Sequence, residues 1–169
     1  MYLSTKIVTS GTDIKLVEQL IVRAVIASDS RHIWEIRNSE ASRKASKNPD
    51  LISFQDHEIW FTQRSKLAKE EPFLVAVLGS QVCGYARADR NSAGELEVSI
   101  AIASAWHSSG FGRKLLCELE QSCSQLGVNQ LSAWVAEGNL QSKKFFLSNK
   151  YAQTENKKDS FDLFTKRLN

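Results

Sequence analysis

The sequence predicts a single α/β domain with one mixed sheet, strands near both ends of the chain and helices between them. Two observations carry this prediction. From Glu95 a ribbon of alternating apolar residues runs to Ile102, and at Phe111 the apolar spacing becomes helical. A buried strand, Leu131–Val135, follows that helix. Since a strand, a helix and a second strand form a crossover, the two strands are expected to lie parallel.

The first part of the chain carries the weakest pattern. Residues 1–19 are interpreted as an N-terminal extension of unknown role, with a short strand at Lys6–Thr9 and a helix from Thr12 or Asp13 to Gln19. The domain itself is predicted over residues 20–169, beginning with a strand at Leu20–Ala27.

Three helical segments are predicted next. One begins near Ser28, Ser39 caps a second short turn that ends at Ala45, and Asn48-Pro49 breaks the chain. A third helix spans about Phe54–Leu67. One face of it carries residues at i, i+3, i+4 and i+7, namely His57, Trp60, Phe61 and Arg64.

The rest of the chain supplies more strands and a final helix. Phe73–Leu78 and Gln81–Arg87 flank a Gly-Ser turn and predict a hairpin. Asn139 is a suitable N-cap for a helix to Asn149. The chain is expected to end in a strand over Asp159–Leu168, with Phe161 and Leu163 alternating.

Composition narrows the class of protein. A chain of 169 residues with 42% hydrophobic and 24% charged residues suits one packed domain. The net charge of +3 comes from scattered Lys and Arg, so a nucleic-acid platform is not indicated. Cys83, Cys117 and Cys123 are interpreted as small buried apolar residues in a reducing compartment. No apolar run approaches membrane-spanning length, and a cytoplasmic protein without membrane contact is expected.

Gly110 and Gly112 lie where the apolar ribbon becomes a helix. The first N–H groups of a helix lack internal partners, and the helix dipole adds positive charge there, so this order suits a phosphate. The alternative is an ordinary turn that uses glycine for its backbone freedom. Neither the dinucleotide fingerprint nor a GxxxxGK[ST] loop is present.

The loop resembles the acyl-CoA signature of the GNAT acetyltransferase superfamily, in which two apolar strand positions precede Arg/Gln-x-x-Gly-x-Gly/Ala. Here Ile100 and Ile102 are the strand positions, and the loop runs from His107 to Gly112. Downstream residues also match in order: Asn139, Ser142, Phe146 and Tyr151. The resemblance implies a mostly antiparallel sheet with splayed parallel central strands, helices on both sheet faces and acetyl-CoA as cosubstrate.

The same resemblance implies a set of acetyl-CoA contacts. They are Ile100, Ala101, Ile102, His107, Ser108, Ser109, Gly110, Phe111, Gly112, Arg113, Asn139, Ser142 and Phe146. Two positions depart from the family pattern, because His107 replaces the usual Arg or Gln and Phe146 replaces a common tyrosine acid. Lys114 is a further source of positive charge, although Arg113 and Lys114 also suit a solvated helix face.

Acetyl transfer to an amine needs a proton acceptor near the thioester. Glu95 and Glu97 are the candidates, each with a solvated strand face as an equal alternative, and His57 is a third candidate or else a structural histidine. A strand bulge would change which face they occupy. Thiolate could leave unprotonated, or Ser142, Tyr85 or Tyr151 could replace the missing acid. No metal is expected, since His57-Glu58 lacks the second histidine of a zinc helix.

The N-terminal half resembles bacterial aminosugar-nucleotide N-acetyltransferases of the pseudaminic acid and nonulosonate pathways. The shared residues are Arg37-Asn38, Ile52-Ser53, and His57, Trp60 and Phe61. The resemblance implies that Arg37, Asn38, His57, Trp60 and Phe61 bind a UDP-aminosugar, while a core role for the aromatic residues remains an alternative. Acetylation of a protein N-terminus or small amine, and a CoA-binding module without turnover, are the competing functions. A homodimer is left open.

Overall fold

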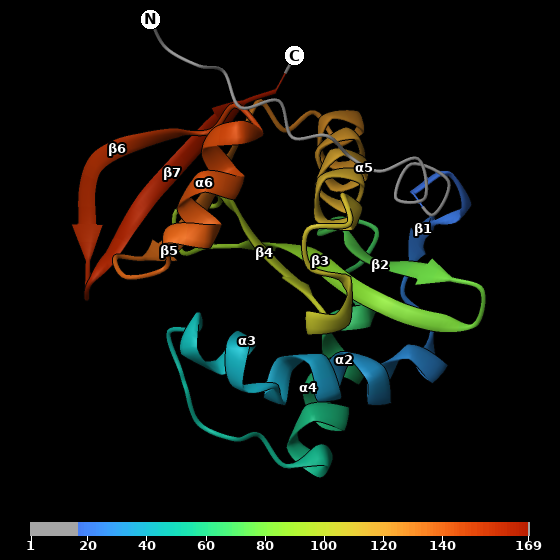
Figure 1. Ribbon diagram of the computed structural model, residues 1–169. Helices are drawn as coiled ribbons and strands as arrows, with labels where there is room; N and C mark the ends of the chain where they lie inside the picture. The colour runs from blue at the N-terminus through green and yellow to red at the C-terminus, as the bar shows by residue number, and fades with distance from the viewer. Residues whose placement is uncertain (1–16, 169) are drawn as a thin grey trace, which may run out of the picture.

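One seven-stranded sheet organises the computed structural model, which describes residues 17–168 (Figure 1). The strand order is β1-β2-β3-β4-β5-β7-β6, and only β4 and β5 are parallel neighbours. The strands are β1 (Ile21–Ala24), β2 (Phe73–Leu78), β3 (Gln81–Arg90), β4 (Leu96–Ile102), β5 (Gln130–Ala136), β6 (Ala152–Lys158) and β7 (Phe161–Arg167). The predicted mixed, mostly antiparallel sheet is confirmed.

Helices cover both faces of this sheet, as expected (Figure 1). Two lie on one face: α5 (Phe111–Gln125) and α6 (Leu140–Ser148). Three lie on the other: α2 (Ser30–Asn38), α3 (Glu40–Lys44) and α4 (Phe54–Lys66). Short 3₁₀ turns, η1 (Ala27–Asp29) and η2 (Ser104–Trp106), precede α2 and α5.

Each face of the sheet has its own apolar core. The core under α5 and α6 contains Leu96 and Val98 of β4, Leu115 and Leu119 of α5, and Phe146 of α6. A second core contains residues of α2, α4, β2 and β3, namely Ile33, Ile36, Phe61, Phe73, Val75, Val77, Val82 and Tyr85. Because strand side chains alternate between faces, neighbouring residues of β4 point into different layers.

The parallel pairing of β4 and β5 is short. Leu96 pairs with Leu131 and Glu97 with Ser132, and the register ends there. On its other side β4 pairs with β3 without interruption from Leu96 to Ile102. The two central strands therefore separate over the second half of β4, which confirms the expected splay. No bulge interrupts β4 in its pairing with β3, so Glu97, Ser99 and Ala101 share the face of α2 and α4.

The chain leaves the first strand earlier than predicted, since β1 ends at Ala24 and η1 occupies Ala27–Asp29. The cause is Asp29. Its carboxylate accepts hydrogen bonds from the Arg23 guanidinium at 2.7 and 2.8 Å and from the Ile26 N–H at 2.8 Å. These contacts bend the chain into a turn where the apolar residues alone indicated a continuing strand.

Strand β6 was not predicted from the sequence. Its residues, AQTENKK, are polar and almost wholly exposed, so no apolar alternation marks the strand. β6 is an edge strand, and lysines on such an edge discourage pairing with other chains. Its neighbour β7 also differs from expectation, because Phe164 is fully buried while Phe161 and Leu163 are only partly buried. Phe164 is covered by α6, because the centre of its ring lies 6.2 Å from that of Phe146.

The cysteine interpretation was partly wrong, because Cys117 is exposed, while Cys83 and Cys123 are buried. The strand and helix predicted before residue 17 lie outside the described residues, and residues 17–19 are helical. Within residues 17–168, every helix is too short or too polar to cross a membrane.

Candidate active site

A cavity of about 1640 Å³ lies along the separation of β4 and β5 and reaches the helices on both faces. Fifteen of the twenty residues singled out from the sequence as catalytic or ligand-binding line it. They are Arg37, His57, Trp60, Glu97, Ile100, Ala101, Ile102, His107, Ser108, Gly110, Gly112, Arg113, Asn139, Ser142 and Phe146. The fold thus gathers residues from β4, from the α5 and α6 layer and from the α2 and α4 layer around one space.

Five of the predicted residues do not line this cavity. Phe61 and Phe111 are core residues with 4% and 0% of their surface exposed. The Ser109 hydroxyl donates to the Trp106 carbonyl at 2.5 Å. Glu95 precedes β4 and lines a small second pocket. The Asn38 side-chain amide donates to the Ile52 carbonyl and accepts from the Ile52 N–H. Asn38 therefore holds the α3–α4 connection to α2.

The N-terminus of α5 opens into the cavity through two glycines. Gly110 is its N-cap with φ of +84°, a left-handed conformation that favours glycine, and no described side chain caps the helix. A Cβ at Gly112 would lie 3.3 Å from Phe145 Cε2, so the loop also packs closely on α6. The first N–H groups of α5 are therefore available to an anion.

Charge near this turn comes from Arg113 rather than from Lys114. The Lys114 ammonium donates to the carbonyls of Val17 and Leu20, at 2.9 and 2.6 Å. It ties the segment before β1 to α5 and does not line the cavity. Arg113 does line the cavity. His107 also lines it, but its Nε2 donates to the Ile102 carbonyl at 2.9 Å, so only its other ring nitrogen is left for a ligand.

Helix α6 forms the wall of the cavity opposite α5. The Asn139 side chain caps the helix, accepting from the Ser142 N–H at 3.0 Å, as its sequence position predicted. Its amide nitrogen is left for another partner. Phe145 and Phe146 line the cavity with their rings 5.4 Å apart, and the latter is 5% exposed. This wall is apolar at its middle and polar at both ends of the helix, where Gln141 and Ser142 and then Ser148 and Asn149 line the cavity.

On the other face of the sheet, the cavity is lined by Arg87, whose side chain is fixed by an ion pair, and by the ring of Trp60. Arg87 of β3 pairs with Asp89, and its guanidinium carbon lies 5.3 Å from the centre of the Trp60 ring. Asp89 in turn accepts from buried Arg64 Nε at 2.7 Å. Arg64 also donates to the carbonyls of Glu71 and Ala88 at 2.9 Å. These contacts fix Arg87 over Trp60.

A second arginine, Arg37 at the end of α2, lines the same part of the cavity. Its Nη2 donates to the Asn48 carbonyl at 2.7 Å, whereas its Nη1 is buried without a partner among the described residues. A buried guanidinium N–H without an acceptor is costly, so an anionic ligand would be bound favourably here.

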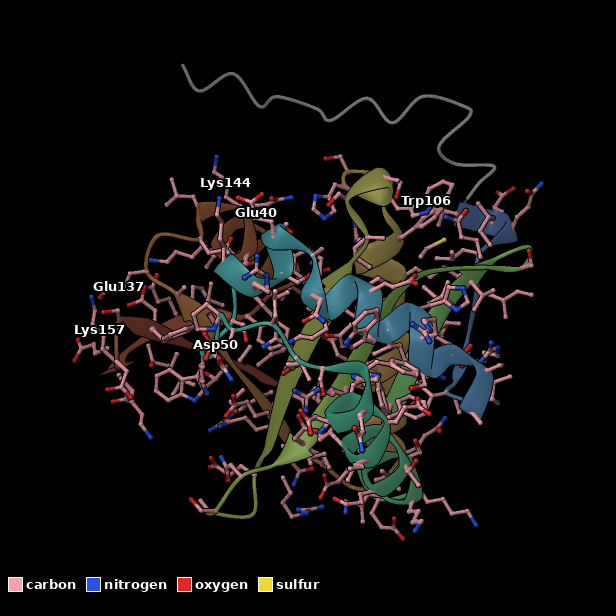
Figure 2. All side chains as sticks on the ribbon, turned by 90° about the horizontal axis from the view of Figure 1, so that it is seen from below. Glu40, Asp50, Trp106, Glu137, Lys144 and Lys157 are labelled. Atoms are coloured by element: carbon pink, nitrogen blue, oxygen red, sulfur yellow. The ribbon has the colours of Figure 1, made fainter. Side chains whose placement is uncertain are left out.

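Glu97 is the carboxylate that the splay exposes. It is the last residue of β4 paired with β5, and its side chain is 24% exposed. The Lys47 ammonium lies 2.8 Å from Glu97 Oε1 and 5.5 Å from the centre of the Trp134 ring. Lys47 belongs to the loop between α3 and α4, which Figures 1 and 2 place on the α2 and α4 face of the sheet.

His57 lies at the edge of the cavity inside an aromatic cluster. It is 2% exposed, and its Nε2 donates to the Ser30 carbonyl at 3.0 Å. The rings of Trp60 and Phe61 are 5.3 and 5.9 Å from it. Burial lowers the pKa of His57, against the smaller opposing effects of the Ser30 carbonyl and Glu58. A neutral imidazole is therefore favoured at neutral pH.

Of the tyrosines that could replace the missing acid, Tyr85 alone lines the cavity. Its Cα pairs with that of Ala101 in β4, and its side chain is 7% exposed. Burial raises the pKa of Tyr85, while Arg87 and Arg37 oppose the shift, so the hydroxyl keeps its proton. Tyr151 lies in the core beyond α6, where burial raises its pKa as well.

Several lining residues were not identified from the sequence, among them Lys47, Arg87 and Trp134. Arg87 offered a signal, because it is the one charged residue in the hairpin arm predicted at Gln81–Arg87. Lys47 offered none, since only the fold brings its loop to Glu97. Within residues 17–168, no group of three or more His, Cys, Asp or Glu side chains is placed to hold a metal ion.

Comparisons with known proteins agree with this geometry. The acetyltransferase (GNAT) family model matches residues 31–150. No curated protein matches the chain significantly. Among solved structures, the putative acetyltransferase yncA from Salmonella typhimurium is 24% identical with a TM-score of 0.74, covering 89% of this chain and 94% of its own.

Two further structures are similar over most of their length. A ribosomal-protein-alanine N-acetyltransferase from Brucella melitensis is 25% identical with a TM-score of 0.74, over 88% of this chain and 99% of its own. A phosphinothricin acetyltransferase from Sinorhizobium meliloti is 22% identical with a TM-score of 0.75, over 89% of both chains. Since the family model covers most of the chain and the seven-stranded sheet has the splay expected of this fold, the protein belongs to the GNAT acetyltransferase family and is an N-acetyltransferase.

Proposed function

We propose that the enzyme transfers the acetyl group of acetyl-CoA to the primary amine of a nucleotide-linked deoxy-aminosugar. One observation carries the proposal. A single cavity joins the N-terminus of α5 on one sheet face to Arg37, Arg87 and Trp60 on the other, with Glu97 between them. An anionic donor and an anionic acceptor can thus meet beside one carboxylate.

The donor side fits the diphosphate and arm of acetyl-CoA. The unpartnered N–H groups after Gly110 would hold the diphosphate, with Arg113 adding charge. Beyond Glu97, the backbone of β4 that faces β5 has no strand partner, so Ile100–Ile102 can pair with the amides of the pantetheine arm. Two of the similar structures, yncA and the Sinorhizobium meliloti enzyme, are described as acetyl-CoA complexes.

On the acceptor side, Trp60 offers an aromatic face for a sugar or uracil ring. Arg87, held by Asp89, and the free Nη1 of Arg37 offer donors to a diphosphate. An acidic groove, which a polyamine would require, is not formed by the described lining residues. Three of the four lining carboxylates are paired with cations: Asp89 with Arg64 and Arg87, Glu97 with Lys47, and Glu137 with Lys157. The fourth, Asp56, accepts a hydrogen bond from the Ser53 hydroxyl.

The reaction itself needs three groups from this chain. Glu97 takes a proton from the acceptor ammonium, directly or through a water molecule. A backbone N–H within Ser99–Ile102 stabilises the oxyanion that develops on the thioester. Tyr85, which lines the cavity beside Ala101 and keeps its proton, protonates the departing thiolate. With Glu97 as the base, His57 has a structural role in the wall of the cavity on the acceptor side.

The proposal is tested by measuring the rate of thiol release from acetyl-CoA in the presence of three different amines. They are a UDP-linked dideoxy aminosugar, spermidine and a peptide with a free N-terminal alanine. We expect release with the aminosugar and much slower release with the other two amines. Preference for the peptide would move the enzyme toward acetylation of protein N-termini, and the Brucella melitensis structure is named as a ribosomal-protein-alanine N-acetyltransferase. Tight CoA binding by calorimetry without release with any amine would leave a binding module.

A further inference from the structure

A lysine of the protein itself, Lys47, has its amine beside the proposed base. The Nζ of Lys47 lies 2.8 Å from Oε1 of Glu97, the proposed base. The same ammonium lies 5.5 Å from the centre of the Trp134 ring, a cation–π contact at the other side of the splay. All three residues line the main cavity, together with Val98–Ile102 of β4.

The backbone around Lys47 holds this amine in place. Before it, the Ser46 N–H donates to the Arg43 carbonyl at 3.1 Å. After it, the Asn48 carbonyl accepts from Arg37 Nη2 at 2.7 Å, and the Pro49 carbonyl accepts from Arg43 Nη1 at 3.1 Å. The lysine is therefore presented from a fixed stretch of loop. Fixing the reactants in this way can replace a large part of the entropy cost of bringing them together.

Other lysines near the cavity lack one of these features. Lys44 pairs with Glu40, four residues earlier on α3, and that pair is 74% and 72% exposed. Lys157 pairs with both Glu137 and Asp162, at 2.7 and 3.5 Å. Lys157 is not among the residues that line the cavity, whereas Lys47 is. Figure 2 shows Glu137 and Lys157 at the β6 end of the sheet, away from Trp106 before α5.

We propose that Lys47 is an acetylation site of the enzyme, modified by its own active centre from acetyl-CoA. One proton passes from the Lys47 ammonium to Glu97, and the free amine attacks the thioester carbon. The C–S bond then breaks. Of the two remaining N–H protons, one stays in the amide and the other neutralises the thiolate. The products are acetyl-lysine, CoA thiol and the proton on Glu97, which returns to solvent.

Acetylation would change the acceptor side of the cavity. Acetyl-lysine carries no charge, so the ion pair with Glu97 and the cation–π contact with Trp134 would both be lost. Glu97 would then be free to receive the ammonium of an external acceptor. The inference rests on the proposed role of acetyl-CoA and Glu97, but it does not depend on the identity of the external acceptor.

The test is to incubate the full chain with acetyl-CoA and no acceptor, and to follow acetylation by intact mass and peptide mapping. We expect one acetyl group on Lys47, added at least about tenfold faster than on Lys44, because a positioned base contributes factors of this size or more. Lys47→Arg should remove the modification, and Lys44→Arg is the matched control that keeps it. Glu97→Gln should abolish most of it while acetyl-CoA binding, measured by calorimetry, persists.

Three results would overturn the inference. They are an unmodified Lys47, a Lys47 acetylated at the same rate in Glu97→Gln, and a rate per molecule that rises with protein concentration. A parallel thiol-release assay with external amines separates this failure from failure of the proposed function. If external amines are acetylated while Lys47 is not, the proposed function stands and the inference fails. If neither is acetylated although acetyl-CoA binds, both fail.

Discussion

Glu97 and Ser132 are the last paired residues of the two parallel strands at the centre of the sheet. One step earlier, Leu96 and Leu131 are buried partners in the core under α5. Beyond Glu97 the strands separate, and the cavity occupies the space between them. The carboxylate therefore lies where the sheet changes from a packed core into a binding site.

This position leads to a prediction about the base. Glu97→Gln should lower kcat by about 10²-fold or more, the usual contribution of a positioned general base, while acetyl-CoA affinity stays nearly constant. Glu95→Gln is the comparison. Glu95 lies outside the main cavity and accepts from Asn91 Nδ2 at 3.3 Å, so its change should have little effect on kcat. Steady-state kinetics with both variants is the measurement, and unchanged turnover in both would remove them as bases.

The glycine turn before α5 allows a matched test of the acetyl-CoA site. Gly110 and Gly94 have φ of +84° and +83°. A Cβ added at Gly94, which lies outside the cavity, would meet no atom within 4 Å, and one added at Gly110 would lie 3.2 Å from Val17 Cγ2, a side-chain atom. Substitution of either by Ala should cost about 1–2 kcal/mol of stability, because both would hold an L-residue in a left-handed conformation. Only Gly110→Ala should also weaken acetyl-CoA binding, by about tenfold, which corresponds to ~1.4 kcal/mol. Calorimetry and urea denaturation measure the two effects, and equal affinities would contradict the site.

Arg87 should act on the acceptor and not on the donor. Since a hydrogen bond to a charged group is worth about 1.5–3 kcal/mol, Arg87→Gln should raise KM for a UDP-aminosugar by tenfold or more, with a small change in kcat. Asp89 keeps its bond to Arg64 in this variant, so the strand should remain in place. The control substrate is an amine of similar size that carries no phosphate. An equal rise in KM for that amine would argue against a diphosphate at this position.

The group that protonates the departing thiolate can be identified with two conservative variants. Tyr85→Phe removes a hydroxyl beside Ala101 and should lower kcat by about 10²-fold, the lower end of what a positioned general acid contributes. Tyr151→Phe removes a hydroxyl buried in the core, away from the cavity lining, and should leave kcat unchanged. Pre-steady-state thiol release separates the chemical step from product release. Equal rates for Tyr85→Phe and the parent enzyme would mean that the thiolate leaves without this acid.

His57 leads to a prediction about pH. Burial lowers its pKa in the folded state, so the unfolded chain binds more protons near its ordinary pKa of about 6.5. Stability should therefore be complete above that value and fall as the pH drops through it toward the folded pKa. Replacement with Gln should flatten this dependence and lower kcat less than Glu97→Gln does. Urea denaturation between neutral and mildly acidic pH is the measurement, and an unchanged slope would refute the assignment.

Most of the secondary structure was predictable because its physical signals are local. The Ser53 and Asn139 side chains accept the N-cap hydrogen bonds of α4 and α6, and both residues stand directly before the first helical position in the sequence. The hairpin was marked by Gly79 with φ of +60°. β6 could not be predicted in this way, since an exposed polar edge strand is defined by the hydrogen bonds of its neighbour.

By itself, the sequence determined the strand, glycine turn and helix from Leu96 to Gln125, because alternation, glycine and helical spacing act over a few residues. It also indicated the family, through the motif in that segment and the matching residues from Asn139 to Tyr151 after it. Only the tertiary structure decided which charged residues meet. Lys47 and Glu97 are fifty residues apart in the chain, and Arg64, Asp89 and Arg87 form one line of contacts from two elements. Such contacts follow from how the layers pack and leave no local pattern to read.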